Sequence, residues 1–250
     1  MFFVWGTKLI RKARGWVADF CPKCRAPEAF ELRQVNKVQH IYYLPLGRGQ
    51  LVGHERRCQH CGIVLTAQPA RYVAIAPHPA PIRELITQTF PTLEQAYAPR
   101  LELEQRLRQS PASLSGAERR ALILESFMLI SPKVEKRYSA THFDRESALT
   151  LLGAVLAVIL AIVAGRRLAP DDVAFVILAV FLAGAAALIA ALATGNARYL
   201  RREVYPALGA TLKPLQPTQS ELDAALGELK KLGHKLGSKA RMPELMAGMS

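Results

Sequence analysis

The amino-acid sequence predicts a multi-domain membrane protein, built from a small β domain, a helical cytoplasmic segment and a two-helix transmembrane hairpin. Two observations support this fold class. Residues 147–165 and 173–194 are apolar segments without a charged side chain. The four cysteines of the chain form two Cys-x-x-Cys pairs, both near the N-terminus. A length of 250 residues suits one or two small domains in addition to the hairpin.

Each apolar segment is long enough to cross a membrane. A bilayer core requires about 20 consecutive apolar residues of helix, and both segments meet this requirement. A buried pair of helices in a soluble domain is the alternative. The connector between the segments, residues 166–172, leaves no room for a domain. Both flanking regions are therefore expected on the same side of the membrane.

Basic residues near the helix ends predict which side that is, because loops rich in Lys and Arg stay in the cytoplasm. The connector contributes Arg166 and Arg167. The outer ends contribute Lys133, Lys136, Arg137, Arg145, Arg198, Arg201 and Arg202. We therefore expect a multi-pass protein of the plasma membrane with both termini in the cytoplasm.

Small residues recur every four positions on one face of the first apolar segment, at Gly153, Ala157, Ala161 and Gly165. Small side chains let helix backbones approach closely in lipid, so this face is expected to pack against a helix. Neither apolar segment contains an ionisable residue, which proton relays and ion paths usually require. A transporter or channel is therefore disfavoured.

The strongest chemical signal is the set Cys21, Cys24, Cys58 and Cys61, in which each pair is separated by two residues. Four thiolates satisfy the tetrahedral preference of Zn²⁺ at bonds of about 2.3 Å and leave no open position for water. The spacing therefore predicts structural zinc. Two disulfides are one alternative, which the cytoplasm opposes, and iron in the same four-cysteine geometry is another.

The residues between the cysteine pairs are rich in β-branched and aromatic side chains. We expect strands at residues 30–35, 38–46 and 50–57, with Gly47-Arg48-Gly49 as a turn. A three-stranded sheet with a metal at one end is a zinc ribbon, here expected over residues 1–68. Such a small sheet buries little apolar surface, so the metal is expected to supply much of its folding free energy.

Residues 1 to about 65 resemble a bacterial zinc-ribbon family. The motifs that carry the resemblance are the opening Phe2-Phe3-Val4-Trp5-Gly6-Thr7-Lys8, Cys21-Pro22-Lys23-Cys24, Ile41-Tyr42-Tyr43-Leu44-Pro45-Leu46, and Cys58-Gln59-His60-Cys61-Gly62. Members often have glycine after the first cysteine pair, where this chain has Arg25. The resemblance implies zinc binding and suggests no activity. The membrane that the hairpin crosses is expected to be the bacterial inner membrane.

The other regions are assigned from their composition. Residues 69–81 contain four prolines and are expected to form a linker. Residues 82–146 are expected to form the helical cytoplasmic segment. Residues 195–250 are expected to be a basic cytoplasmic tail, with an amphipathic helix at residues 220–236 that docks on the membrane surface or on a partner helix.

Charge is concentrated at the N-terminus, where residues 1–80 contain 12 Lys and Arg against 4 Asp and Glu. Anionic membrane lipids attract such a segment. The residues Tyr42, Tyr43, Arg48, Arg56 and Arg57 could instead form a stacking and phosphate surface for nucleic acid, or a surface for an acidic partner.

No nucleophile and base pair, phosphate loop or carboxylate pair stands out, so neither enzyme activity nor a small-molecule substrate is expected. We expect a non-catalytic, membrane-anchored zinc-ribbon protein that presents a basic module to a cytoplasmic or membrane protein partner. One alternative is a membrane-tethered protein that binds nucleic acid. The other is a structural subunit of a larger membrane complex.

Overall fold

The computed structural model describes residues 5–42, 44–140, 143–168 and 173–248, without the side chains of residues 165–168 and 173. Contacts divide the chain into two compact units, Met1–Ser115 and Gly116–Ser250. This boundary falls inside residues 82–146, which the sequence predicted as one segment. The difference arises because the first helices of that segment pack on the N-terminal sheet, whereas its last helix packs on the C-terminal helices.

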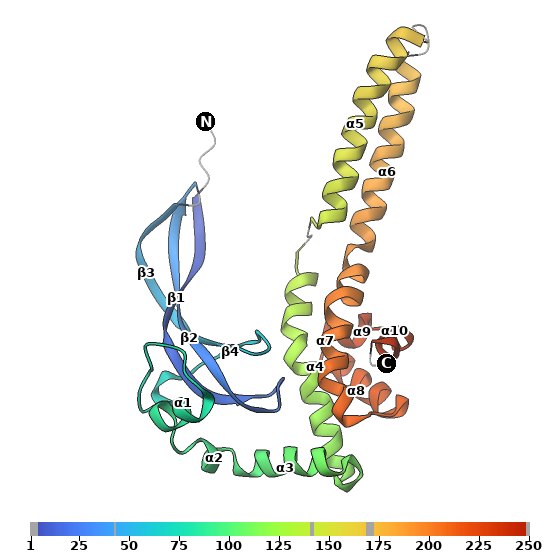
Figure 1. The fold of residues 1–250 in the computed structure, drawn as a ribbon. Coiled ribbons are helices and arrows are strands. Elements are labelled where there is room, and N and C mark those ends of the chain that lie inside the picture. Colours follow the sequence, from blue (N-terminus) through green and yellow to red (C-terminus); the bar gives the residue numbers. More distant parts are fainter. Residues whose placement is uncertain (1–4, 43, 141–142, 169–172, 249–250) are drawn as a thin grey trace. The chain divides into compact units, whose positions relative to one another are not determined.

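The first unit is built on a four-stranded antiparallel sheet (Figure 1). Its strands are β1 (Trp5–Cys21), β2 (Ala26–Ile41), β3 (Leu44–Cys58) and β4 (Val64–Thr66), and each pairs with its neighbour in the sequence. The sequence predicted a three-stranded sheet and did not predict β1. Residues 17–21 of β1 are all buried, so the simple alternation that identifies a half-buried strand is absent there.

The turn between β2 and β3 lies elsewhere than predicted. Ile41 pairs with Leu44, so the chain reverses between these two residues, and the expected strand at residues 38–46 is wrong. The expected turn at Gly47 and Gly49 is part of β3, where both glycines have positive φ and the register with β2 shifts. Glycine allows this irregular backbone, so these residues mark a bulged strand rather than its end.

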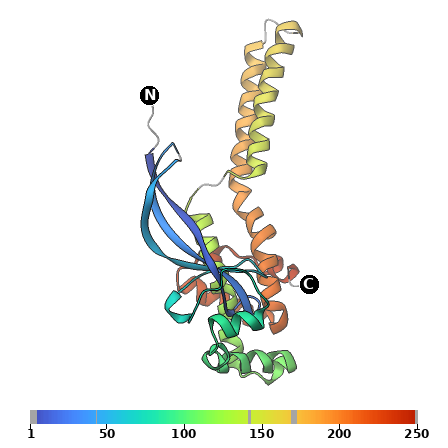
Figure 2. The ribbon, with the colours of Figure 1, turned by 60° about the vertical axis from the view of Figure 1, so that its left-hand side comes forward.

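Three helices complete the first unit: α1 (Ile82–Thr89), α2 (Leu93–Ala96) and α3 (Ala98–Gln109). The strands extend well beyond them toward the end of the sheet that holds the β2–β3 turn (Figure 2). The segment before α1, expected to be a linker, packs on the sheet, because Tyr72 and Ala76 are buried and Ala76 forms a β-bridge with Trp16.

The second unit contains a hairpin of two long helices, α5 (Arg145–Leu168) and α6 (Val173–Tyr199). Both are long and apolar enough to cross a membrane, and at most 6% of their most apolar windows is buried in the structure. Core helices of a soluble protein would be mostly buried, so this exposure favours the membrane over the alternative of a buried pair. Residues 169–172 of the predicted connector lie outside the described residues.

The two hairpin helices meet along a different line from the predicted one. A Cβ atom on Gly184 would lie 2.8 Å from the Cβ of Ala154, so the two backbones approach closely at these residues. Gly153 and Ala157 are exposed and Ala161 is half-buried, whereas the side-chain position of Gly165 lies outside the described residues. The predicted small-residue face is therefore largely turned away from the partner helix, because the seam runs through residues 154 and 158 instead.

The rest of the second unit is a helical cluster. Its helices are α4 (Gly116–Tyr138), α7 (Tyr205–Leu212), α8 (Gln219–Lys231), α9 (Lys235–Lys239) and α10 (Met242–Ala247). The apolar side of the predicted tail helix is used inside this cluster, since Leu222, Leu229 and Leu236 are fully buried. Docking of that face on a membrane surface is therefore contradicted. The helix also breaks at Gly233, whose φ is +81°, so the prediction of one helix over residues 220–236 is wrong.

Candidate metal centre

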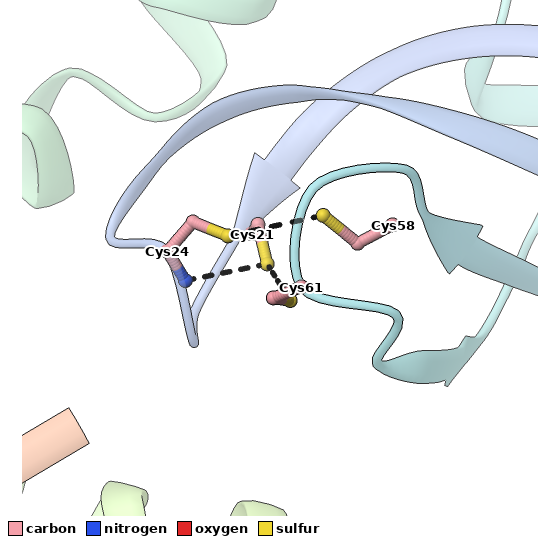
Figure 3. Close-up of side chains that lie close together, drawn as sticks. All are labelled: Cys21, Cys24, Cys58 and Cys61. Carbon is pink, nitrogen blue, oxygen red and sulfur yellow. Dashed lines mark hydrogen bonds between the residues drawn. The ribbon is translucent and has the colours of Figure 1, made fainter. Parts of the chain in front are cut away.

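Two similar turns bring the four cysteines together. Cys21 and Cys24 lie at the turn from β1 to β2, and Cys58 and Cys61 lie at the turn from β3 to β4 (Figure 3). Because β1 and β3 both pair with β2, and β1 runs parallel to β3, their last residues reach the same end of the sheet. This topology explains how cysteines separated by more than thirty residues meet at one point.

Each turn is closed by a backbone hydrogen bond from the residue after the second cysteine. The Arg25 N–H donates to the Cys21 carbonyl at 2.7 Å, and the Gly62 N–H donates to the Cys58 carbonyl at 3.0 Å. Both residues have left-handed backbones, with φ of +56° at Arg25 and +70° at Gly62. The Cys24 N–H also points at the Cys21 Sγ, at 3.4 Å. Amides directed at the sulfur favour its thiolate form.

The sulfur atoms are spaced as a tetrahedral metal site requires. All four Sγ atoms lie within 4.8 Å of one another, with Cys21 to Cys61 at 3.6 Å and Cys24 to Cys58 at 3.8 Å. Metal–sulfur bonds of about 2.3 Å at tetrahedral angles place sulfurs about 3.8 Å apart. The four cysteines can therefore hold one metal ion as a closed ligand set. Disulfides are not formed in the structure, where all four cysteines are free.

Four thiols at this distance cannot all lose their protons without a cation. The hydrogen bond to Cys61 and then burial raise the pKa of the Cys21 thiol, and burial raises that of Cys24. The same hydrogen bond lowers the pKa of Cys61 to about 5, because it stabilises the thiolate. One thiolate therefore forms readily, and a bound divalent cation is needed to supply the charge that stabilises the others.

Two arginines close to the cysteines in sequence, Arg25 and Arg56, are engaged by buried carboxylates. The Arg25 Nη1 lies 3.2 Å from Glu104 Oε2 of α3, and the Arg108 Nη2 donates to the Arg25 carbonyl at 2.9 Å. Arg56 Nη1 lies 2.6 Å from Asp19 Oδ2. Both ion pairs therefore tie the metal turns to the rest of the unit.

Asp19 is the centre of a buried network that sequence analysis missed. Its carboxylate is fully buried and accepts hydrogen bonds from Tyr72 Oη at 2.6 Å and Tyr97 Oη at 2.8 Å, in addition to the ion pair with Arg56. Burial, followed by the charge of Asp19 and the hydrogen bond to it, raises the pKa values of Tyr72 and Tyr97. These four residues come from distant parts of the chain, so no local sequence pattern could have grouped them.

The predicted nucleic-acid or acidic-partner surface does not assemble as one site. Tyr42 and Arg48 are exposed near the β2–β3 turn, and Tyr43 lies outside the described residues. Arg56 is buried against Asp19, whereas Arg57 is exposed beside the cysteines. At about 3.4 Å per residue of strand, Arg48 and Arg57 are separated by about 30 Å along β3.

Comparison with models of protein families, with curated proteins and with solved structures found no match to this chain. The assignment of a function therefore rests on the chemistry and arrangement of the residues themselves.

Proposed function

We propose that this chain is a non-catalytic, membrane-anchored zinc-ribbon protein of the bacterial inner membrane. The hairpin α5–α6 anchors it, both termini lie in the cytoplasm, and the metal-stabilised first unit is presented there to a protein partner. The observation that carries the proposal is the combination, in one chain, of a closed four-cysteine centre and two exposed apolar helices.

Zinc is the metal that this centre suits best. The ligand set consists of four thiolates with no position left for water, which is the pattern of structural zinc sites. The family that residues 1 to about 65 resemble also binds zinc. Zinc is neither reduced nor oxidised in proteins, so a zinc centre requires no electron-transfer role for this chain. Iron would satisfy the same geometry and is distinguished by analysis of the bound metal.

The orientation follows from the basic residues at the outer ends of the hairpin. Arg198 pairs with Asp144 and Glu146, and Arg202 also pairs with Glu146. These ion pairs do not change the expected orientation, because membrane topology follows the distribution of Lys and Arg and is little affected by acidic residues. The outer ends therefore favour the cytoplasm.

The surface offered to a partner is the extended part of the sheet, which we call the arm and define as residues 5–14, 34–42 and 44–54. The arm and its turn contain six Lys and Arg residues and no Asp or Glu: Lys8, Arg11, Lys12, Arg14, Lys37 and Arg48. Of these, Arg11 pairs with Glu55 next to the arm. Such a surface attracts an acidic partner and speeds its association.

Photo-crosslinking from the arm tests this function in intact membranes. Benzoylphenylalanine replaces Lys12 on the arm, and Val73, which is 72% exposed elsewhere in the unit, is the matched control position. The proposal predicts a discrete protein adduct from position 12 that survives nuclease and is absent from position 73. An adduct that disappears with nuclease would favour the nucleic-acid alternative. Identical adducts from both positions would contradict a specific surface.

A further inference from the structure

The free end of the arm has a cluster of exposed apolar side chains, which we call the tip and define as Trp5, Leu9, Ile41, Tyr42, Leu44 and Leu46. Trp5 is 83% exposed and Leu44 is 70% exposed. Apolar residues scattered singly on a surface need no explanation, but a contiguous group marks an interaction site. The register of the sheet shows whether this group is contiguous.

Cross-strand pairing places three members of the tip, including the two most exposed, in one row. Trp5 pairs with Ile41, and Ile41 pairs with Leu44, so the three side chains lie on the same face of adjacent strands. Two residues further along each strand, and on the same face, Gln39 pairs with Leu46. Because directly paired side chains are about 5 Å apart, the row forms one apolar edge at the end of the sheet.

The turn between β2 and β3 has a tyrosine at a position where Asn or Gly would be less strained. Two residues, Tyr42 and Tyr43, connect the paired residues Ile41 and Leu44. Two-residue hairpin turns favour Asn and Gly because they require positive φ. Tyr42 instead adopts φ of +48° while its side chain is 51% exposed. A bulky residue in that region is strained, and such strain is concentrated at functional positions.

Three cations lie close to the tip in sequence or in strand register. Lys37 pairs with Leu9 across the strands, Lys8 lies one residue before Leu9, and Arg48 lies two residues after Leu46. No carboxylate occurs among residues 5–14 and 34–54. The chemistry of this end is therefore an apolar row with Trp and Tyr, next to Lys and Arg.

We propose that the tip inserts into the anionic surface of the same membrane that the hairpin spans. Trp and Tyr favour the boundary between lipid and water, apolar side chains enter the acyl region, and Lys and Arg contact anionic headgroups. Each cation near such a surface raises binding about fivefold. Nucleic acid would match the cations but would offer no apolar layer for Ile41, Leu44 and Leu46.

The inference rests on the proposed membrane anchor and deepens it, because it assigns the tip to lipid and leaves the cations near β1 residues 11–14 for the protein partner. The arm spans about 30 Å from Gly15 to Trp5, at about 3.3 Å per residue. Insertion of its end would give the first unit a second, reversible attachment to the bilayer.

Trp5 provides its own reporter. The chain has two tryptophans, so the conservative variant Trp16→Phe leaves Trp5 as the single one. The full-length variant is placed in nanodiscs that contain phosphatidylglycerol and lipids brominated in their acyl chains, which quench only tryptophan that reaches them. We expect strong quenching of Trp5 in anionic discs, and loss of that quenching in discs of phosphatidylcholine alone or at high salt.

Two further variants make the result decisive. Leu44→Asp should abolish the quenching of Trp5, whereas Val73→Asp, an equally exposed substitution away from the tip, should retain it. Phe181→Trp in a Trp5→Phe/Trp16→Phe background reports the hairpin. Quenching at position 181 without quenching of Trp5 would overturn the tip inference and leave the anchor intact. Quenching at neither position would overturn both, and equal quenching of Trp5 in neutral discs would overturn the requirement for anionic lipid.

Discussion

Arg25 and Glu104 form an ion pair in which both side chains are buried. Their side chains are 7% and 3% exposed, and their charged atoms are 3.2 Å apart. Arg25 directly follows the second metal-turn cysteine, Cys24, whereas Glu104 lies in α3. The pair therefore connects the geometry of the cysteine turn to the helix that packs beside it.

Replacement of Arg25 separates its two roles. Arg25→Gly and Arg25→Ala both remove the guanidinium, but only alanine must place a Cβ in the left-handed backbone that Arg25 adopts. We expect both variants to be less stable than the wild type, with alanine lower than glycine by about 1 kcal/mol. Urea unfolding of the full chain in mild detergent, followed by tryptophan fluorescence, gives the two values. Equal stabilities would show that the left-handed backbone contributes nothing.

Removal of the buried charge at Asp19 should weaken the whole first unit. Asp19→Asn leaves the Arg56 guanidinium, which is 11% exposed, without its carboxylate. Loss of one partner of a buried pair destabilises a protein by about 3 kcal/mol. The same urea experiment measures this loss. The control Glu94→Gln changes an exposed carboxylate of α2 and should leave the midpoint unchanged.

The carboxyl of Glu221 is expected to make the stability of the second unit depend on pH. The pKa of its carboxyl is lowered to about 2 from its ordinary value near 4.5, first because Arg119 hydrogen-bonds to it and then because it caps α8 with Thr218. A carboxyl with a lowered pKa in the folded state stabilises the fold above about pH 4.5, and this contribution is lost as the pH falls toward 2.

Hydrogen exchange of the α8 amides, corrected for intrinsic rates, checks this prediction. Protection should fall between about pH 5 and about pH 3 in the wild type, and Glu221→Gln should be less protected at the higher pH and show a smaller change. Glu228→Gln is the matched control, because its partner Arg120 is 67% exposed. A control variant that lost the pH dependence while Glu221→Gln kept it would contradict the assignment.

Arg198 holds the base of the hairpin together. It bonds Asp144 at 2.9 Å, Glu146 at 2.5 Å and the Ala191 carbonyl at 2.9 Å, and so joins the start of α5 to the end of α6. We expect Arg198→Ala to lower the Tm in nanodiscs by about 3 °C, since several contacts are lost at once. Arg201→Ala removes one exposed pair with Glu244 and should change the Tm less.

The parts of the structure that the sequence predicted well are those encoded locally. The four cysteines cluster, as their spacing indicated, and the two charge-free segments form long exposed helices. Helix α1 lies within residues 82–146, which were predicted to be helical. The Cys-x-x-Cys spacing and the uninterrupted apolar segments are local features of the sequence. The structures they form therefore depend little on contacts with the rest of the chain.

The parts that were missed depend on long-range contacts. Strand β1 was not predicted, because helix and strand packing buries residues 17–21 without alternation. The pairs Arg25–Glu104 and Asp19–Arg56 join residues far apart in the sequence, and charged residues are normally expected at the surface. The leucines of α8 and α9 show an amphipathic pattern that does not reveal whether lipid or another helix covers them.

Metal content tests the central claim most directly. The full chain is extracted from membranes without chelator, and zinc and iron are measured per chain beside Cys58→Ser as the control. The account predicts about one zinc per chain in the wild type, held by the four thiolates, and little in the variant. Protein that is folded and membrane-bound but contains no metal, or contains the same zinc after loss of Cys58, would contradict it. Stoichiometric iron would retain the centre and overturn its assignment to zinc.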